Sequence, residues 1–266
     1  MKSPIVSVDW LHEHLEDPEL IVLEAILDTP SQDIQIKRAR LFDIKNKFSD
    51  TSNPLPNTLP SPEDFAIACQ KIGIDNNSKI VVYDTKGIYS SPRAWWLFKI
   101  MGHEKVWVLD GGLPAWLNEN YPTENRQEPS YPKGNFEAHF QPQLVKTKEQ
   151  LLKNIQSKKS LVVDARSTDR FQGETKEPRV GLRSGHIPGS INIPYTQVLK
   201  NGKFLQKKEI KKILPQQDKN LIFSCGSGIT ACIDLIAYEL ISDKAKAVYD
   251  GSWTEWGQDE NLPIEK

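Results

Sequence analysis

The length, composition and charge of the chain already narrow its class. Its 266 residues suit two domains of roughly 120 residues better than one. With 38% hydrophobic and 26% charged residues, it has the composition of a folded protein. Its formal net charge of -1 provides no overall electrostatic attraction to nucleic acid or anionic membranes. The first residues contain no apolar signal core, and no apolar run is long enough to span a membrane. We therefore expect a cytoplasmic protein that binds neither nucleic acid nor membrane.

The first half of the chain reads as alternating strands and helices. Short apolar runs at residues 21–25 (IVLEA) and 80–84 (IVVYD) are typical of buried strands in a mainly parallel sheet. Residues 93–101 follow the second of these strands and have helical apolar spacing, and Asp110-Gly111 with Trp116 comes later in this half. This order predicts an α/β domain over residues 1–125.

A proline-rich stretch comes next, with Pro129, Pro132 and Pro142 and little periodicity. Such a composition indicates a linker, which we place at residues 126–145.

The second half repeats the first. Residues 161–165 (LVVDA) and Asp250-Gly251 with Trp256 lie 140 residues after their counterparts, and residues 221–225 (LIFSC) lie 141 residues after theirs. A second helical pattern covers residues 230–240. We expect a second α/β domain over residues 146–266, so that each half has a mainly parallel sheet flanked by helices.

The cysteines point to thiol chemistry or to packing. Cys69, Cys225 and Cys232 form neither an even set nor a pair two residues apart, which argues against a disulfide scaffold and against a zinc site. No other pattern calls for a metal or an organic cofactor. The alternatives for each thiol are therefore nucleophile and core residue.

A glycine-rich loop follows the strand that ends at Cys225. Two glycines allow the backbone to curl so that successive N–H groups point inward, and the next helix adds its positive end. Beyond the carboxyl end of a parallel strand, where ligands bind in open α/β sheets, this arrangement would stabilise a thiolate or persulfide anion. The loop reads Cys225-Gly226-Ser227-Gly228-Ile229-Thr230.

These residues resemble the active loop of the rhodanese superfamily, specifically that of the 3-mercaptopyruvate sulfurtransferases, which has valine where this chain has Ile229. Residues 184–194, 249–256 and 89–96 resemble further signatures of the family. The resemblance implies two tandem rhodanese-like domains, of which only the C-terminal one is catalytic, because Asp84 stands where the repeat aligns Cys225. It also implies transfer of sulfur from 3-mercaptopyruvate through a Cys225 persulfide to a thiol, thioredoxin or cyanide, with release of pyruvate.

The same resemblance implies roles for the residues around the loop. Ser227 would assist sulfur transfer, and the backbones of Gly226, Gly228, Ile229 and Thr230 would hold the anionic sulfur. Arg170 and Arg179 match the arginines that grip the carboxylate and ketone of the substrate, a task suited to charge-assisted guanidinium contacts. The alternative for either arginine is an ion pair with Asp169 or Glu177.

The loop also separates related activities. Thiosulfate sulfurtransferases of the superfamily have basic residues directly after the cysteine, whereas Gly226 and Ser227 carry no charge, so a keto-acid donor is favoured and thiosulfate is the alternative. Phosphatase relatives need an arginine six residues after the cysteine, where this chain has Ala231.

Two positions depart from the family. An acidic residue and a histidine are proposed to form a triad with the loop serine, but this chain has Lys45 and Asn57 at those places. A noncatalytic binding or sensor protein of the same fold is therefore an alternative.

Other conspicuous side chains are expected to be structural. The tryptophans at repeat-related positions, Cys69 and Cys232 are expected to fill the core, and His186 is expected to bond nearby backbone groups.

Overall fold

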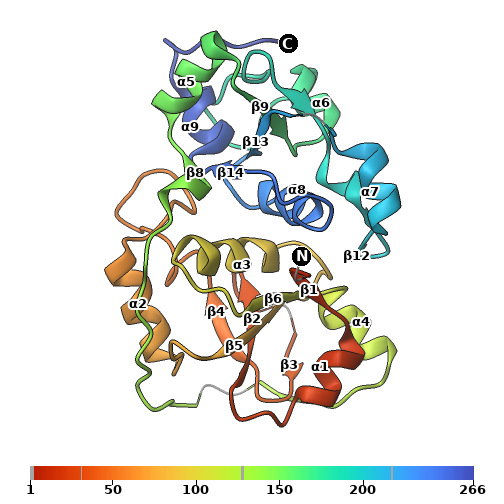
Figure 1. The fold of residues 1–266 in the computed structure, drawn as a ribbon. Helices are drawn as coiled ribbons and strands as arrows, with labels where there is room; N and C mark the ends of the chain where they lie inside the picture. Colours follow the sequence, from red (N-terminus) through yellow and green to blue (C-terminus); the bar gives the residue numbers. More distant parts are fainter. Residues whose placement is uncertain (1–2, 31, 127–128, 217) are drawn as a thin grey trace.

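Two α/β units are stacked one above the other in the computed structural model, which describes residues 3–30, 32–126, 129–216 and 218–266 (Figure 1). Each unit is built on a five-stranded parallel sheet, as predicted. The runs of Ile, Val and Leu form the central strands and are buried on both faces, because helices cover both sides of each sheet.

The N-terminal sheet has the strand order β1-β6-β5-β2-β4. Its strands are β1 (Ile5–Val6), β2 (Leu20–Ile26), β4 (Arg40–Asp43), β5 (Lys79–Tyr83) and β6 (Val106–Leu109). The C-terminal sheet has the corresponding order β8-β14-β13-β9-β10. Its strands are β8 (Val145–Lys146), β9 (Ser160–Asp164), β10 (Ile191–Asn192), β13 (Asn220–Ser224) and β14 (Lys246–Tyr249). Equivalent strands occupy equivalent places, so the sequence repeat is a repeat of structure.

The helices are short and several begin at polar caps. The side chains of Ser7, Ser61 and Thr147 accept hydrogen bonds from backbone N–H groups in the first helical turn. The helices of the N-terminal unit are α1 (Val8–His14), α2 (Pro62–Lys71), α3 (Ser91–Ile100) and α4 (Gly112–Asn118). Those of the C-terminal unit are α5 (Lys148–Ser157), α6 (Thr168–Gln172), α7 (Lys207–Ile213), α8 (Ala231–Glu239) and α9 (Ser252–Gln258).

Two small antiparallel pairs and two 3₁₀ turns complete the described elements. The pairs are β3 (Ile34–Ile36) with β7 (Thr123–Asn125) and β11 (Leu199–Lys200) with β12 (Lys203–Phe204), and the turns are η1 (Pro142–Leu144) and η2 (Tyr195–Val198).

The connecting segment packs on the N-terminal unit. The N–H groups of Gly134 and Phe136 donate to the carbonyls of Gln70 and Ile74, and Phe136 is buried. Residues 127–128 of the predicted linker lie outside the described residues. The boundaries 1–125, 126–145 and 146–266 remain our proposal; β8 begins at Val145 through pairing with β14, which periodicity does not reveal.

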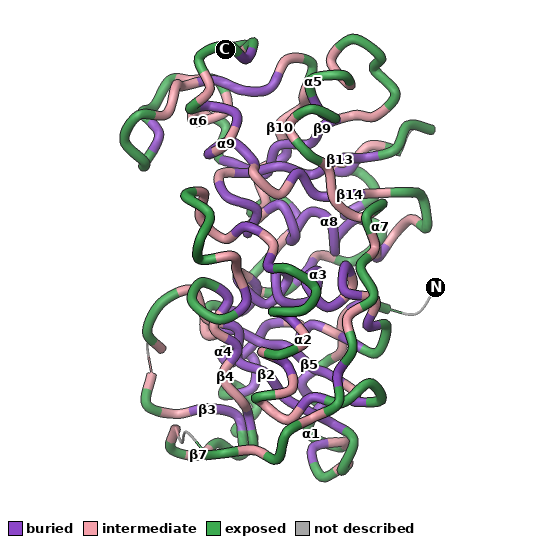
Figure 2. The backbone as a smooth tube through the Cα atoms, turned by 90° about the vertical axis from the view of Figure 1, so that its left-hand side faces the viewer, coloured by how far each residue is buried: buried purple, intermediate pink, exposed green. Residues whose placement is uncertain are grey.

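The two units meet through helices α3 and α8. Nine of the ten residues of α3 and eight of the nine residues of α8 are buried, because each helix lies between its own sheet and the other unit (Figures 1 and 2). The core side chains include Cys69, Cys232 and five tryptophans, in agreement with the expectation from the sequence. These tryptophans are Trp95, Trp96, Trp116, Trp253 and Trp256.

Helix α8 also buries a carboxyl group. Asp234 is fully buried, and neither of its carboxyl oxygens has a hydrogen-bond partner among the residues that the structure describes. Burial, reinforced by the charges of Cys225 and Asp164, raises the pKa of Asp234 well above its ordinary value of 3.8.

This burial predicts a pH-dependent cost in stability. Above about pH 4 the unfolded chain releases the Asp234 proton while the folded chain keeps it, so stability falls as pH rises toward the folded pKa. We expect Asp234→Asn to raise the free energy of unfolding at pH 7 by up to about 4 kcal/mol, with the gain shrinking toward pH 4. Urea unfolding from pH 4 to 8 measures it, and a gain independent of pH would contradict it.

Candidate active site

A cleft of about 500 Å³ lies between the two units and has Cys225 in its wall. The N-terminal unit contributes Leu27, Asp28, Lys45, Pro56, Asn57 and Tyr89. The C-terminal unit contributes all the residues that the sequence singled out except Gly228: Arg170, Arg179, Cys225, Gly226, Ser227, Ile229 and Thr230. Both domains therefore build the candidate site.

Cys225 follows the last residue of β13, in the centre of the C-terminal sheet. Its N–H donates to Ser252 Oγ at 3.3 Å, and its carbonyl accepts from the N–H of Trp253 at 2.9 Å. Only 1% of the residue is exposed, so the thiol is largely shielded from solvent at the bottom of the cleft.

The loop between Cys225 and α8 leaves its N–H groups available. Within the described part of the chain, none of the N–H groups of residues 226–230 donates to a protein acceptor. Gly228 has φ +76°, a left-handed conformation that glycine adopts without strain, and its carbonyl accepts from Arg93 at 3.2 Å. The loop therefore has donors for an anion beside the sulfur.

The equivalent loop of the N-terminal unit shows what such a loop binds. Asp84 follows β5 as Cys225 follows β13. Its Oδ2 accepts hydrogen bonds from the N–H groups of Tyr89, Ser90 and Ser91 at 2.8 to 3.0 Å, and from the Ser91 hydroxyl at 2.7 Å. The N-terminal loop is thus filled by its own carboxylate, and it has no thiol.

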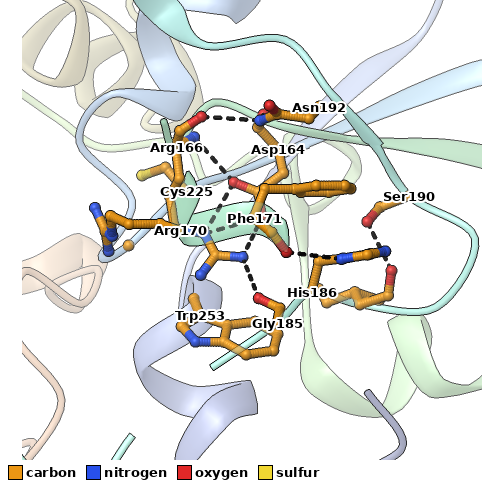
Figure 3. A network of polar contacts seen from close by, with 12 residues as sticks. Asp164, Arg166, Arg170, Phe171, Gly185, His186, Ser190, Asn192, Cys225 and Trp253 are labelled. Atoms are coloured by element: carbon orange, nitrogen blue, oxygen red, sulfur yellow. Dashed lines mark hydrogen bonds and ion pairs between the residues drawn. The ribbon is translucent and has the colours of Figure 1, made fainter. Parts of the chain in front are cut away.

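Arg170 reaches the loop from α6 and is held by a buried network. Its guanidinium donates to both carboxylate oxygens of Glu177, at 2.6 and 3.2 Å. Glu177 also accepts from Arg166, and the carboxylates of Glu177 and Asp164 are both buried. Arg166 in turn pairs with Asp164 (Figure 3). Burial opposes the Arg170 charge, but Glu177 and the nearby Cys225 outweigh it and raise the pKa of Arg170. The ion pair with Glu177, an alternative from the sequence, therefore exists and orients Arg170.

Arg179 also contacts the loop. Its Nη1 donates to Thr254 Oγ1 and its Nη2 to Ser227 Oγ, each at 3.4 Å. A Cβ added at Gly226 would lie 3.2 Å from Arg170 and 4.0 Å from Arg179. The absence of a side chain at residue 226 therefore makes room for the guanidinium of Arg170 beside the cysteine loop, and Arg179 lies within ordinary contact distance of the same point.

The two positions that depart from the family also lie in the cleft. Lys45 forms an exposed ion pair with Asp28 at 3.0 Å. Asn57 Nδ2 lies 3.2 Å from Ser227 Oγ and 3.4 Å from the Ser227 carbonyl oxygen. An amide therefore contacts the loop serine at the place of the missing histidine.

Sequence reasoning missed four side chains around the loop. Tyr89 and Tyr195 line the cleft with their rings 6.2 Å apart, and burial, then Tyr195 and Cys225, raises the pKa of Tyr89. Arg93 and Asp250 form an ion pair at 2.8 Å across the domain interface. Tyr89, Arg93 and Asp250 lie in motifs that the sequence shows and Tyr195 directly follows one, but only the tertiary fold brings these side chains to the loop of Cys225.

Further side chains are structural, as expected. His186 Nδ1 bonds the carbonyl of Phe171 at 2.8 Å, and its ring stacks on the Phe171 ring (Figure 3). Among the described residues, no cluster of three His, Cys, Asp or Glu could hold a metal ion, and no helix is long and apolar enough to cross a membrane.

A thiol on an anion-binding loop at the carboxyl end of a parallel sheet defines a protein that can carry a transferable group on cysteine. The rhodanese-like domain model matches residues 7–119 and 147–259, and the chain belongs to this family. The fold predicted from the sequence, two tandem rhodanese domains, is thereby confirmed.

Named relatives agree with this assignment. The chain is 40% identical to thiosulfate/3-mercaptopyruvate sulfurtransferase 1, mitochondrial, of Arabidopsis thaliana, covering 99% of this chain and 78% of the relative. It is 37% identical to 3-mercaptopyruvate sulfurtransferase of Escherichia coli, covering 98% and 97%. The crystal structure of a 3-mercaptopyruvate sulfotransferase from Escherichia coli superposes with a TM-score of 0.85 at 35% identity, covering 95% of this chain and 99% of that one.

Proposed function

We propose that this protein transfers the sulfur of 3-mercaptopyruvate through a Cys225 persulfide to a thiol, thioredoxin or cyanide acceptor. One observation carries the proposal: a single cleft brings together the thiol of Cys225, two arginines, and loop N–H groups that have no acceptor within the described part of the chain. The donor in the names of the relatives has the groups that this cleft can bind, a carboxylate, a ketone and a thiol.

Arg170 and Arg179 would hold the carboxylate and the keto oxygen of the donor, because guanidinium groups make strong hydrogen bonds to both. The Cys225 thiolate would then attack the donor sulfur. The S–S bond forms as the C–S bond breaks, and the electron pair passes to the keto-acid fragment as an enolate, which takes up a proton to become pyruvate. The persulfide anion left on Cys225 would accept hydrogen bonds from the N–H groups of the loop.

Transfer to an acceptor completes the cycle. An acceptor thiolate or cyanide attacks the outer sulfur of the persulfide, the S–S bond breaks, and Cys225 leaves as thiolate. No redox cofactor is needed, because the sulfane sulfur moves between nucleophiles. All three cysteines are free, which suits a reducing compartment such as the cytoplasm.

Two alternatives lead to different measurements. The first alternative is thiosulfate as the sulfur donor. One relative is named for both thiosulfate and 3-mercaptopyruvate, and the arginines of the cleft could bind the thiosulfate dianion. A noncatalytic protein of this fold would have no need for a thiol in the wall of the cleft beside loop N–H groups that have no acceptor among the described residues.

Intact mass spectrometry after mixing with 3-mercaptopyruvate tests the proposal. We expect one added sulfur atom and one equivalent of pyruvate. No added mass with 3-mercaptopyruvate, together with loading by thiosulfate, would establish the alternative donor, and no loading by either would refute a sulfurtransferase.

The arginines provide a second prediction. We expect Arg179→Ala to lower kcat/KM for 3-mercaptopyruvate by about ten- to a hundredfold, the effect of losing one charge-assisted hydrogen bond. Arg170→Ala is expected to act at least as strongly, because it also removes a partner of the buried Glu177. Arg183→Ala, which changes an arginine bonded to backbone carbonyls away from the cleft, is the control. Steady-state kinetics with both donors measure the effect, and unchanged kcat/KM would contradict it.

A further inference from the structure

The contacts of Asn57 and Arg179 with Ser227 fix the orientation of the serine hydroxyl group. Ser227 Oγ lies within hydrogen-bond distance of two nitrogen atoms, Asn57 Nδ2 at 3.2 Å and Arg179 Nη2 at 3.4 Å. Both nitrogens can only donate, so the Ser227 oxygen accepts from both. A hydroxyl oxygen has two lone pairs and one hydrogen, and these two contacts occupy both lone pairs.

The orientation of the Asn57 amide follows from a second contact. Its Nδ2 also lies 3.4 Å from the Ser227 carbonyl oxygen, which can only accept. Turning the amide over would place its oxygen against that carbonyl. Asn57 is itself held in place, because its own carbonyl accepts from the buried Arg93 and its backbone has a left-handed φ of 60°, which asparagine tolerates well.

We infer that Asn57 is a positioning residue that directs the Ser227 hydroxyl hydrogen into the cleft, where it donates to the bound keto acid or the transferred sulfur. The inference rests on the proposed function. No acceptor for this hydrogen is found among the described residues, and Ser227 faces the cleft beside Cys225. In this arrangement the serine is a permanent donor.

A donor held in this way needs no titrating partner. A histidine at residue 57 would act on the serine only in the protonation state that suits it, whereas the amide of Asn57 does not titrate near neutral pH. Lys45, at the place of the acidic partner, pairs with Asp28 and has no described contact with Asn57 or Ser227. Ser227 is therefore oriented without a relay of protons.

The isosteric change Asn57→Asp tests the direction of the hydrogen bond. An ionised carboxylate can only accept, so it would draw the Ser227 hydrogen away from the cleft. We expect kcat at pH 8 to fall by about ten- to a hundredfold, with a smaller change in KM. Acidification should restore activity as residue 57 takes up a proton and donates again, which adds a limb to the pH profile that the wild type lacks.

Two comparisons separate this role from a structural one. Asn53→Asp adds the same charge in the same loop without contacting Ser227, and it keeps the acceptor for the Leu55 N–H, so we expect wild-type kinetics. In a Ser227→Ala background, Asn57→Asp should cost less than about threefold, because the hydroxyl it misdirects is gone. An equal loss in both backgrounds, or a loss that does not depend on pH, would overturn the inference.

The double variant Asn57→His with Lys45→Asp provides a further test of the inference. Because Asn57 already orients the serine, restoring the family's residues should raise kcat by no more than about tenfold, below the usual range of general acid–base help. A gain of a hundredfold or more would overturn the inference. Persulfide formation by the wild type is followed separately by intact mass; its failure with 3-mercaptopyruvate refutes the proposed donor, and the Asn57 series is then read with thiosulfate.

Discussion

Cys225→Ser is expected to abolish the added sulfur after mixing with 3-mercaptopyruvate and to reduce turnover to less than about one thousandth, as loss of a catalytic nucleophile does. A serine oxygen cannot form the S–S bond on which the proposed transfer depends. The substitution changes one buried atom of similar size, so the loop and its N–H groups should stay in place. Intact mass spectrometry and the release of pyruvate measure the effect.

The other two cysteines are the matched controls. Burial raises the pKa of Cys69 well above its ordinary value and that of Cys232 to about 12, so neither is a thiolate at neutral pH. Both are completely buried, and neither lines the cleft. Cys69→Ala and Cys232→Ala should therefore still gain one sulfur, on Cys225. A persulfide mapped by peptide digestion to another cysteine would contradict the assignment.

The fold could be predicted because its signals are local and appear twice. The buried strands at residues 21–25 and 161–165 each begin with three consecutive apolar residues, and their constant offset shows that the second half repeats the first. The short strands β1 and β8 were not predicted, since two residues have no period and form a strand only through pairing with a longer one.

The residues of the site that lie in one short stretch of chain were predicted, whereas those that reach the site from a distant stretch were missed. The two glycines within the six residues that start at Cys225 predict an anion-binding loop. By contrast, Tyr89 and Arg93 lie more than 130 residues before the loop that they approach, and their motif is equally compatible with a helix in the core. The sequence offers the pair of Arg170 with Glu177 as an alternative to substrate binding, whereas in the structure Arg170 both pairs with Glu177 and lines the cleft.

Arg93 joins the two domains directly behind the active loop. Its buried guanidinium pairs with Asp250 at 2.8 Å, donates to the carbonyls of Gly228 and Asn57, and lies 4.6 Å from the centre of the Trp96 ring. Arg93 thus supports both the loop that carries Cys225 and the residue that orients Ser227.

We expect Arg93→Met to lower the free energy of unfolding by about 3–5 kcal/mol, because it leaves the Asp250 carboxylate and two carbonyls without their buried partner. The kcat/KM for 3-mercaptopyruvate should fall by more than about tenfold, since losing a charge-assisted hydrogen bond costs at least that much and the loop loses its support. Urea unfolding and steady-state kinetics measure the two effects. Arg38→Met, which removes an exposed pair with Glu16, should cost less than about 1 kcal/mol and leave activity unchanged.

The partner of Arg93 offers the decisive comparison. Adding Asp250→Asn to Arg93→Met removes the uncompensated charge while keeping an acceptor for the N–H of Leu59, which now bonds Asp250 at 2.8 Å. Part of the lost stability should return, because the largest cost of the single change is an unpaired buried charge. Activity should not return, because no cation then reaches the carbonyls of Gly228 and Asn57. If the single variant were as stable and as active as the wild type, the interdomain ion pair would have no part in holding the loop, and other interdomain contacts, such as the packing of α3 against α8, would have to position the cleft.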